Sequence, residues 1–317
     1  MAVIIFDPSQ SAFLLFLLLL LSQLSVSQNE FLAKDIATHS KQINSVAFTS
    51  DGKHLFSGSE DGTVTLWSTA DWKAQTTFRC DGTPTLSPDH TLVASNGFNK
   101  EIALWDITNG SRIWSSGKLI DYRRCISFPS DGRTIAASSF SEIKLFDVAT
   151  GKELKTLRGH NGWIWSLEYS PDGKHFATGS SDKTGIVWNV SDGVPTVRLF
   201  GHHFGIYTLQ YSPDGNRIAT GSADSTIIIW DASTGTICQL LKGHHGIVTS
   251  ISFSSDGTYL ASGGSDGRII VWDVHAGNEL HSWNAGQGRI TSVCFSTEGK
   301  WIASSGSSGR IKIWNAQ

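Results

Sequence analysis

Histidine, hydroxyl and carboxylate side chains recur together along the chain, a combination that performs nucleophilic hydrolysis when one such set is held in the right geometry. Four tryptophans are each preceded by a His at 28 residues, a Ser or Thr at 10 residues and an Asp at 6 residues. The sets are His39, Ser57, Asp61 and Trp67; His160, Thr178, Asp182 and Trp188; His202, Thr220, Asp224 and Trp230; and His244, Ser262, Asp266 and Trp272. A catalytic triad occurs once in an enzyme, whereas this set occurs four times. The repetition favours a structural role over catalysis.

The spacing of the tryptophans reveals the unit that carries these sets. Residues closing a short apolar run recur at steps of 38, 41, 42, 42, 42 and 42, at Trp67, Trp105, Phe146, Trp188, Trp230, Trp272 and Trp314. A period of 40–45 residues with Gly-His and Trp-Asp marks is typical of β-propeller blades. We therefore expect seven repeats, one for each of these positions.

Each repeat predicts four short strands. Apolar and polar residues alternate, a Ser-Pro-Asp-Gly or Ser-Ser-Asp-Gly turn follows, and two further apolar runs end at the Trp and after it. Such a unit cannot bury both faces alone, but radial stacking of the units can. The last repeat lacks a fourth strand, and residues 29–39 resemble residues 153–160. We expect this N-terminal segment to complete the last blade and close the ring.

These in-phase repeats resemble the WD40-repeat family over residues 29–317. The resemblance implies an all-β, seven-bladed WD40 β-propeller with four antiparallel strands per blade and a ring closed by the N-terminal strand. It also implies a rigid platform for protein interaction within a larger assembly. In this family the Trp, Ser/Thr, His and Asp form a buried hydrogen-bond network, which satisfies every polar atom and replaces the apparent triad.

Three repeats depart from the pattern, and we expect their blades to form with the support of their neighbours. Repeat two keeps Ser95 and Trp105 but has Thr77 and Asn99 at the His and Asp positions. Repeat three has Phe146 for Trp, Ala137 for the hydroxyl and a turn one residue shorter. Repeat seven keeps Ser304 and Trp314 but has Gly286 and Ser308. Repeats two and three should open most readily.

The family's usual contact face carries the turn after the second strand of each repeat. Positions that point to this face, transferred one by one, give the candidates Trp163, Trp165, Tyr207, Tyr122, Arg124, Arg289 and Phe98. Repeats three to five thus offer an aromatic and Arg-bearing sector, and these residue types dominate interface hot spots. The alternative is that Trp163 and Trp165 pack between blades.

Composition argues against several other classes of protein. A net charge of -3 gives no general reason for binding nucleic acid. The four cysteines, Cys80, Cys125, Cys238 and Cys294, show no C-x-x-C spacing, so we expect buried thiols rather than a disulfide framework or a zinc site. No cofactor or metal is predicted.

Residues 1–28 form a hydrophobic N-terminal segment. Its ten apolar residues 12–21 are too few to span a membrane but suit a signal-peptide core, with residues 25–27 as a cleavage candidate. The absence of Lys and Arg, together with Asp7, argues against a signal. Translation of a pyrimidine-rich intron end is a further explanation, which would make the segment an artefact of the gene model. Intracellular and secretory locations both stay open, and the family favours the former slightly.

The function predicted from these patterns is that of a non-catalytic scaffold or adaptor that binds a protein or peptide as a monomeric propeller within a complex. The alternative is a secretory-route propeller that binds a small ligand, or acts as an enzyme, at its central channel. The histidines outside the repeated sets are scattered over different repeats, which argues against that alternative: His54, His90, His175, His275 and His281.

Overall fold

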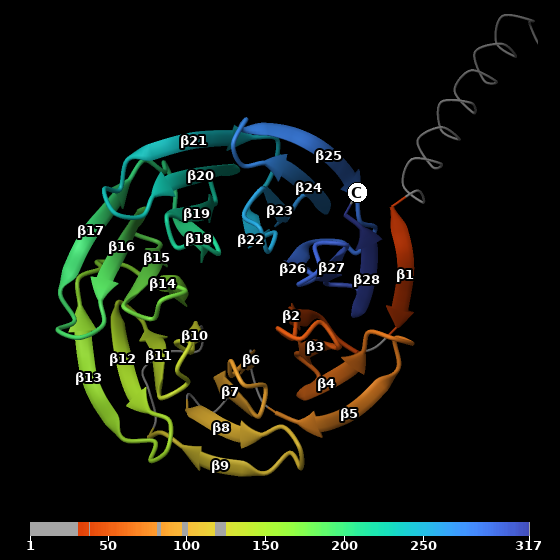
Figure 1. Ribbon diagram of the computed structural model, residues 1–317, viewed down its shortest axis with the longest axis horizontal. Coiled ribbons are helices and arrows are strands. Elements are labelled where there is room, and N and C mark those ends of the chain that lie inside the picture. The colour runs from red at the N-terminus through yellow and green to blue at the C-terminus, as the bar shows by residue number, and fades with distance from the viewer. Residues whose placement is uncertain (1–30, 38, 81–83, 97–100, 118–124, 317) are drawn as a thin grey trace, which may run out of the picture.

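Seven four-stranded sheets surround a common axis, and no helix occurs in the part of the chain that the structure describes (Figure 1). The computed structural model describes residues 31–37, 39–80, 84–96, 101–117 and 125–316. All pairings within the sheets are antiparallel, and six of the sheets consist of four consecutive strands. The chain is therefore an all-β, seven-bladed propeller, as the repeats predict.

The strands of the first three blades, from the innermost outwards, have the following bounds. Blade 1 contains β2 (Ile43–Phe48), β3 (His54–Ser59), β4 (Thr63–Ser68) and β5 (Ala74–Arg79). Blade 2 contains β6 (Pro84–Leu86), β7 (Leu92–Asn96), β8 (Ile102–Asp106) and β9 (Arg112–Ser115). Blade 3 contains β10 (Ile126–Ser127), β11 (Thr134–Ser139), β12 (Glu142–Asp147) and β13 (Glu153–Arg158).

The remaining blades follow in the same order. Blade 4 contains β14 (Ile164–Tyr169), β15 (His175–Ser180), β16 (Thr184–Asn189) and β17 (Pro195–Phe200). Blade 5 contains β18 (Ile206–Tyr211), β19 (Arg217–Ser222), β20 (Thr226–Asp231) and β21 (Ile237–Lys242). Blade 6 contains β22 (Val248–Phe253), β23 (Tyr259–Gly264), β24 (Arg268–Asp273) and β25 (Asn278–Asn284). Blade 7 contains β26 (Ile290–Phe295), β27 (Trp301–Gly306), β28 (Arg310–Asn315) and, outermost, β1 (Leu32–Ala37).

The Ser-Pro-Asp-Gly segments form the turns between first and second strands. In blade 4 the Ser170 hydroxyl donates to Asp172 (2.6 Å), and the Gly173 amide donates to the Ser170 carbonyl (2.9 Å). Gly173 has a φ of 69°, a conformation that glycine adopts without strain. Bonds between Ser170 and His175 complete the turn, with the Ser170 hydroxyl accepting from the His175 amide at 3.0 Å.

The N-terminal strand closes the ring, as expected from its resemblance to the outer strand of another repeat. β1 pairs antiparallel with β28, and Leu32 lies opposite Trp314. Arg310 donates to the Asp35 carboxylate at 2.7 Å, and the Phe31 ring stacks on Trp283 with centroids 5.1 Å apart. Pairing β1 with β28 covers the edge that the last repeat would otherwise expose.

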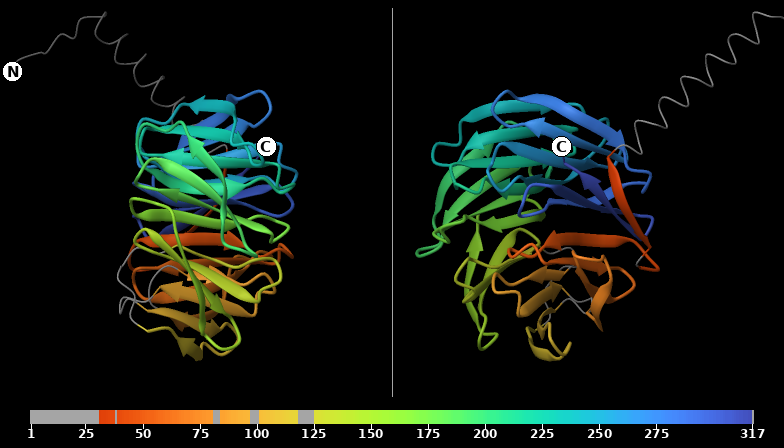
Figure 2. Two further views of the ribbon diagram at one scale, coloured as in Figure 1. Left: turned by 90° about the vertical axis from the view of Figure 1, so that its left-hand side faces the viewer. Right: turned by 45° about the vertical axis from the view of Figure 1, so that its right-hand side comes forward.

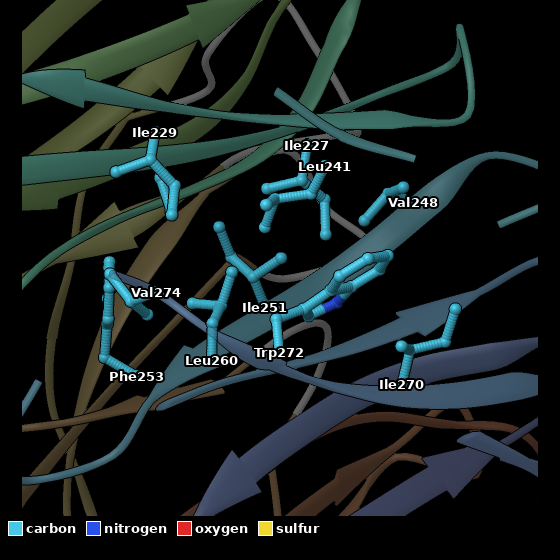
Figure 3. Close-up of a cluster of buried hydrophobic side chains, with 11 residues drawn as sticks. Ile227, Ile229, Leu241, Val248, Ile251, Phe253, Leu260, Ile270, Trp272 and Val274 are labelled. Atoms are coloured by element: carbon cyan, nitrogen blue, oxygen red, sulfur yellow. The ribbon is translucent and has the colours of Figure 1, made fainter. Parts of the chain in front are cut away.

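The hydrophobic core lies mainly between blades. Ile227 and Ile229 of blade 5 pack with Leu260 and Trp272 of blade 6, in a cluster that joins the two sheets (Figure 3). Glycine permits this approach in places: a β carbon on Gly221 would lie 2.6 Å from Cγ1 of Val248 in the next blade. Stacking, rather than any single sheet, buries the apolar faces.

Side chains of one innermost strand also hold the backbone of the next. The Ser252 hydroxyl accepts a hydrogen bond from the Phe295 amide (3.0 Å), and Gln210 accepts one from the Phe253 amide (2.6 Å). Both amides belong to the innermost strands β22 and β26, which have a further strand on only one side. A polar residue at this position therefore joins neighbouring blades.

The turns project from two opposite faces of the ring (Figure 2). Because the strands alternate in direction, one face carries the turns after the first and third strands of each blade. The other carries the turn between the second and third strands and the connection to the next blade; we call it the connection face.

The structure corrects one expectation about the cysteines, and the hydrophobic N-terminal segment lies outside the residues that it describes. None of the four cysteines forms a disulfide, but Cys238, on the outer strand β21, is exposed rather than buried because one face of that strand meets solvent. Within the described ranges, no helix is long and apolar enough to cross a membrane. The hydrophobic segment 1–28 lies outside these ranges.

Candidate functional site

The repeated His, hydroxyl and Asp side chains are joined by hydrogen bonds in each of the four regular blades. In blade 4, Trp188 Nε1 donates to the Thr178 hydroxyl (2.9 Å), which lies 2.8 Å from His160 Nε2. His160 Nδ1 lies 2.8 Å from the Asp182 carboxylate. The corresponding contacts in blades 1, 5 and 6 measure between 2.8 and 3.2 Å.

This geometry leaves no hydroxyl available for attack on a substrate. The side chains of Ser57, Thr178, Thr220 and Ser262 belong to residues that are fully buried, with no accessible surface. In blade 4 the Thr178 hydroxyl oxygen accepts a hydrogen bond from the indole N–H of Trp188. When His160 carries its proton on Nδ1, facing Asp182, its Nε2 accepts the hydrogen bond that the Thr178 hydroxyl donates. A nucleophile needs access to its substrate, and these buried hydroxyls have none.

The carboxylates of the network are held in their charged form. Burial by itself would raise the pKa of Asp182, but hydrogen bonds from His160, Thr184 and the Asn161 amide outweigh it and lower the pKa well below its usual range. Asp224 and Asp266 show the same balance. In blade 1, burial lowers the pKa of His39, against the opposing charge of Asp61.

Blade 7 contains a residue of the hydrogen-bond network, Gln287, that the spacing of the repeats does not predict. Trp314 Nε1 donates to Ser304 Oγ (2.7 Å), and the Ser304 hydroxyl donates to Gln287 Oε1 (2.6 Å). Gln287 is fully buried, and its amide also donates to the Arg310 carbonyl (2.8 Å). It lies one residue after Gly286, the position expected for His, so a search for polar residues within one position would have found it.

Blade 2 keeps only the first of these bonds. Trp105 Nε1 donates to Ser95 Oγ at 2.9 Å. Thr77, at the expected His position, lies in β5 of blade 1 and bonds to Thr65 there (3.0 Å). The step of 38 residues explains this, because β5 and β7 are separated by 12 residues, whereas β13 and β15 of the regular repeat are separated by 16. Asn99 lies outside the described residues.

The aromatic partner candidates meet across blade boundaries on the connection face. Trp163 in blade 4 and Phe140 in blade 3 form a T-shaped ring pair, with centroids 4.9 Å apart and planes at 79°. Trp165 of blade 4 packs against Tyr207 of blade 5, with centroids 4.1 Å apart. Trp163 and Phe140 are exposed, at 39% and 41% of their surface, whereas Trp165 and Tyr207 are half-buried. Trp163 thus presents its ring to solvent, and Trp165 packs partly between blades 4 and 5.

Glycine makes room for the second pair. A β carbon on Gly205 would lie 2.6 Å from Trp165 Cζ3. The next residue back, Phe204, is 60% exposed, and the Lys183 ammonium group lies 5.9 Å from the centre of its ring. We call the surface formed by Phe140, Trp163, Trp165, Phe204 and Tyr207 the aromatic surface.

Phe140 was missed by sequence reasoning, as was Phe204. Phe140 begins the two-residue turn of blade 3 and has a φ of 57°, which is rare for a bulky residue. The sequence signal that could have identified Phe140 is an aromatic residue in a shortened turn, where small or polar residues are usual. A strained backbone of this kind is enriched at functional sites, although Trp72 has a similar φ of 59° away from this surface.

The remaining candidates are not part of this surface. Arg289 is exposed but belongs to the loop before β26 of blade 7, which blades 3 to 5 do not adjoin (Figure 1). Phe98, Tyr122 and Arg124 lie outside the described residues.

A cavity of about 480 Å³ lies between blades 1 and 2, where the inner strand β6 has three residues. His90 lines it and accepts a hydrogen bond from the Ser50 amide at 3.0 Å. The described residues of its lining include no carboxylate and no Lys or Arg. Over the described residues, no group of three or more His, Cys, Asp or Glu is placed to hold a metal ion.

Comparison with known proteins matches five segments of the chain to the family model "WD domain, G-beta repeat": residues 31–68, 151–189, 193–231, 235–273 and 277–315. Together they cover more than half of the chain. The unmatched stretch between them holds most of blades 2 and 3, where the network is incomplete.

Similar proteins come from different cellular settings. The nuclear distribution protein PAC1 of Arthroderma otae is 29% identical over 174 residues, which cover 49% of this chain and 37% of that protein. The periodic tryptophan protein 2 homolog of Dictyostelium discoideum is 28% identical, over 48% of this chain and 18% of that protein. The U3 small nucleolar RNA-associated protein 15 homolog of Xenopus laevis is 29% identical, over 47% and 30%. The chain thus spans less than half the length of these relatives.

Proposed function

Because the chain belongs to the WD40-repeat family, we propose that it is a non-catalytic scaffold that binds a protein or peptide on its connection face, through the aromatic surface. Propellers of this family bind other proteins within complexes. The similar proteins carry names from nuclear distribution and from U3 small nucleolar RNA association, so their common feature is the propeller rather than one process.

The observation that carries this proposal is the exposure of large aromatic rings in one place. Trp163, Phe140 and Phe204 expose between 39% and 60% of their surface, and they lie on turns of three adjacent blades. Aromatic side chains contribute much of the binding energy in interfaces, because they bury a large area at a small cost in conformational entropy. Rigid sheets hold the turns in place, which further lowers the entropy lost on binding.

The non-catalytic part of the proposal is supported by the network geometry. The four hydroxyls that resemble nucleophiles are buried and hydrogen-bonded, as described above.

The test separates binding from packing by treating the two tryptophans differently. Trp163→Ala removes an exposed ring, and Trp165→Phe keeps an aromatic ring in the half-buried position over Gly205. Affinity capture from an extract of the source cells, followed by quantitative mass spectrometry, would compare each variant with the natural chain. We expect Trp163→Ala to lose most of the captured partner while its melting temperature stays within about 2 °C, as for most surface substitutions.

Trp301→Ala is the matched control, since Trp301 is a half-buried Trp at the start of β27, on the opposite face of blade 7. It should retain the partner. Capture that survives Trp163→Ala, or that is lost equally with Trp301→Ala, would contradict the proposal.

A further inference from the structure

The charges around the aromatic surface are uneven. Lys183 is exposed, and no carboxylate of a described residue lies within ion-pair distance of its ammonium group. The negative groups nearby are already engaged. Asp182, the neighbour of Lys183 in the chain, accepts hydrogen bonds from His160 and the Asn161 amide, and 14% of its side chain is exposed.

Two further carboxylates of described residues near this surface are also engaged. Asp224 of blade 5 is bonded to His202 and the His203 amide, with 7% of its side chain exposed. Glu142, which follows the turn of Phe140, pairs with Arg158 at 2.7 Å. A ligand approaching the aromatic surface therefore meets the positive charge of Lys183 without a competing free carboxylate from these three residues.

The backbone gives independent support for a role of these turn residues. Lys183 and Ser225 have φ values of 75° and 68°, in the left-handed region that favours glycine. At the same turn position blades 1, 6 and 7 have glycines, at Gly62, Gly267 and Gly309. Phe140 in the shorter turn of blade 3 has a positive φ as well. Among the turns that the structure describes at this position, those of blades 3, 4 and 5, which carry the aromatic surface, have a side chain in place of glycine, at a cost in backbone strain.

We propose that the aromatic surface takes a linear acidic segment of a partner protein, in which an aspartate or glutamate lies within a few residues of an aromatic or leucine side chain. The proposal rests on the proposed function and names the chemistry of its ligand. The apolar side chain packs against Phe140 and Trp163, and the carboxylate meets Lys183 beside Phe204. An ion pair at this position gains from the neighbouring rings, which reduce its exposure to water.

The experiment uses a random 12-residue peptide library displayed on phage and selected against the immobilised full chain. Enriched peptides are then synthesised with a fluorescent label, and their affinities are measured by fluorescence polarisation. We expect the enriched peptides to contain Asp or Glu close to Trp, Phe or Leu. Lys183→Glu should weaken their binding by roughly two- to fivefold, the upper part of the range for an exposed ion pair. A peptide with Lys in place of its acidic residue should regain affinity for that variant.

Two further variants control for charge and for folding. Lys174→Glu makes the same change at an exposed lysine in the turn after β14, on the opposite face, and should leave binding unchanged. Lys183→Gly removes the charge at a position where the backbone favours glycine, so it should weaken binding without lowering the melting temperature.

The outcomes distinguish this inference from the proposed function. Peptides that lose binding with Trp163→Ala but show no acidic preference and no response to Lys183→Glu would overturn the acidic ligand and leave the binding surface intact. Peptides that bind Trp163→Ala as well as the natural chain would overturn both. Failure to enrich any peptide above a Trp163→Ala target would also count against both.

Discussion

Phe140 and Trp163 form a T-shaped ring pair with a centroid distance of 4.9 Å, although the two residues belong to different blades. The backbone supports the contact, because the Ile164 amide donates to the Phe140 carbonyl at 2.8 Å. The ring pair thus spans the boundary between blades 3 and 4 on a backbone that hydrogen bonds hold in place.

Replacing Phe140 tests whether its backbone strain serves binding. At a φ of 57°, glycine relieves strain that alanine keeps, so Phe140→Gly should be more stable than Phe140→Ala by about 1 kcal/mol. Both variants lose the ring and should bind the partner more weakly than the natural chain. Urea unfolding gives the stabilities, and polarisation with an enriched peptide gives the affinities. Equal stabilities of the two variants would show that a side chain at position 140 causes no backbone strain.

Asp182 should stabilise the fold, and the effect should depend on pH. Asp182→Ala leaves the buried His160 without its carboxylate partner, and the expected cost is about 1–3 kcal/mol at pH 7. The pKa of Asp182 is lower in the folded than in the unfolded state, so its contribution is present above the ordinary Asp pKa and is lost as pH falls below it. The difference between the natural chain and the variant should shrink below about pH 4. Ser308→Ala, at the equivalent but exposed position of blade 7, is the control and should change stability by less than about 0.5 kcal/mol.

Gln287 should contribute to stability as much as a His of the regular blades. Gln287→Ala leaves Ser304 and the Arg310 carbonyl without buried partners, at a cost of about 2–3 kcal/mol. Gln42, whose side chain bonds to Asn44 and Glu60 near the surface, provides the comparison. Gln42→Ala should cost about 0.5 kcal/mol or less, as measured by thermal unfolding. A similar cost for both variants would refute a network role for Gln287.

Glu168 should make stability decrease as pH rises. It occupies the innermost strand β14 at the position of Gln210 in blade 5, and burial raises its pKa to about 8, against a hydrogen bond from the Tyr211 amide. A folded-state pKa above the unfolded value contributes stability that is present at low pH and lost as pH rises through about 8. Glu168→Gln keeps an acceptor without the charge, so its melting temperature should vary less than that of the natural chain between pH 5 and pH 9, a window set by the ordinary Glu pKa and the raised one.

Hydrogen exchange should be fastest in blades 2 and 3. Their innermost strands, β6 and β10, have three and two residues, compared with six in each of the other blades. Fewer ladder bonds and an incomplete network lower the free energy of local opening. Exchange followed by mass spectrometry on peptides from each blade would test this, and uniform protection of all seven blades would be evidence against it.

The fold could be predicted from the sequence because its signals are local and repeated. The turn of Ser170 to Gly173 depends on four consecutive residues, and the step of 42 residues keeps Trp188, Trp230 and Trp272 in register. The closing strand was also predictable, since its pattern matches the outer strand of another repeat.

Features that depend on small changes in repeat length, or on the distance between neighbouring blades, were harder to predict. The repeat spacing assigns Thr77 to the His position of repeat two. Because that repeat is shorter, Thr77 lies instead in β5 of blade 1. Gln287 lies one residue from its expected place, between two glycines with positive φ that displace the chain. The contact of Phe140 with Trp163 needs the distance between two blades, which no spacing within one repeat contains.

The pairing of Leu32 with Trp314 has a consequence for synthesis in the cell. A ribosome makes β1 first among the described strands and β28 last, so the ring stays open until nearly the whole described chain has emerged. During this interval β1 has an unpaired edge that can pair with other chains. Slow translation should therefore prolong the period in which the nascent protein is prone to aggregate, and early binding of a chaperone to β1 would protect it.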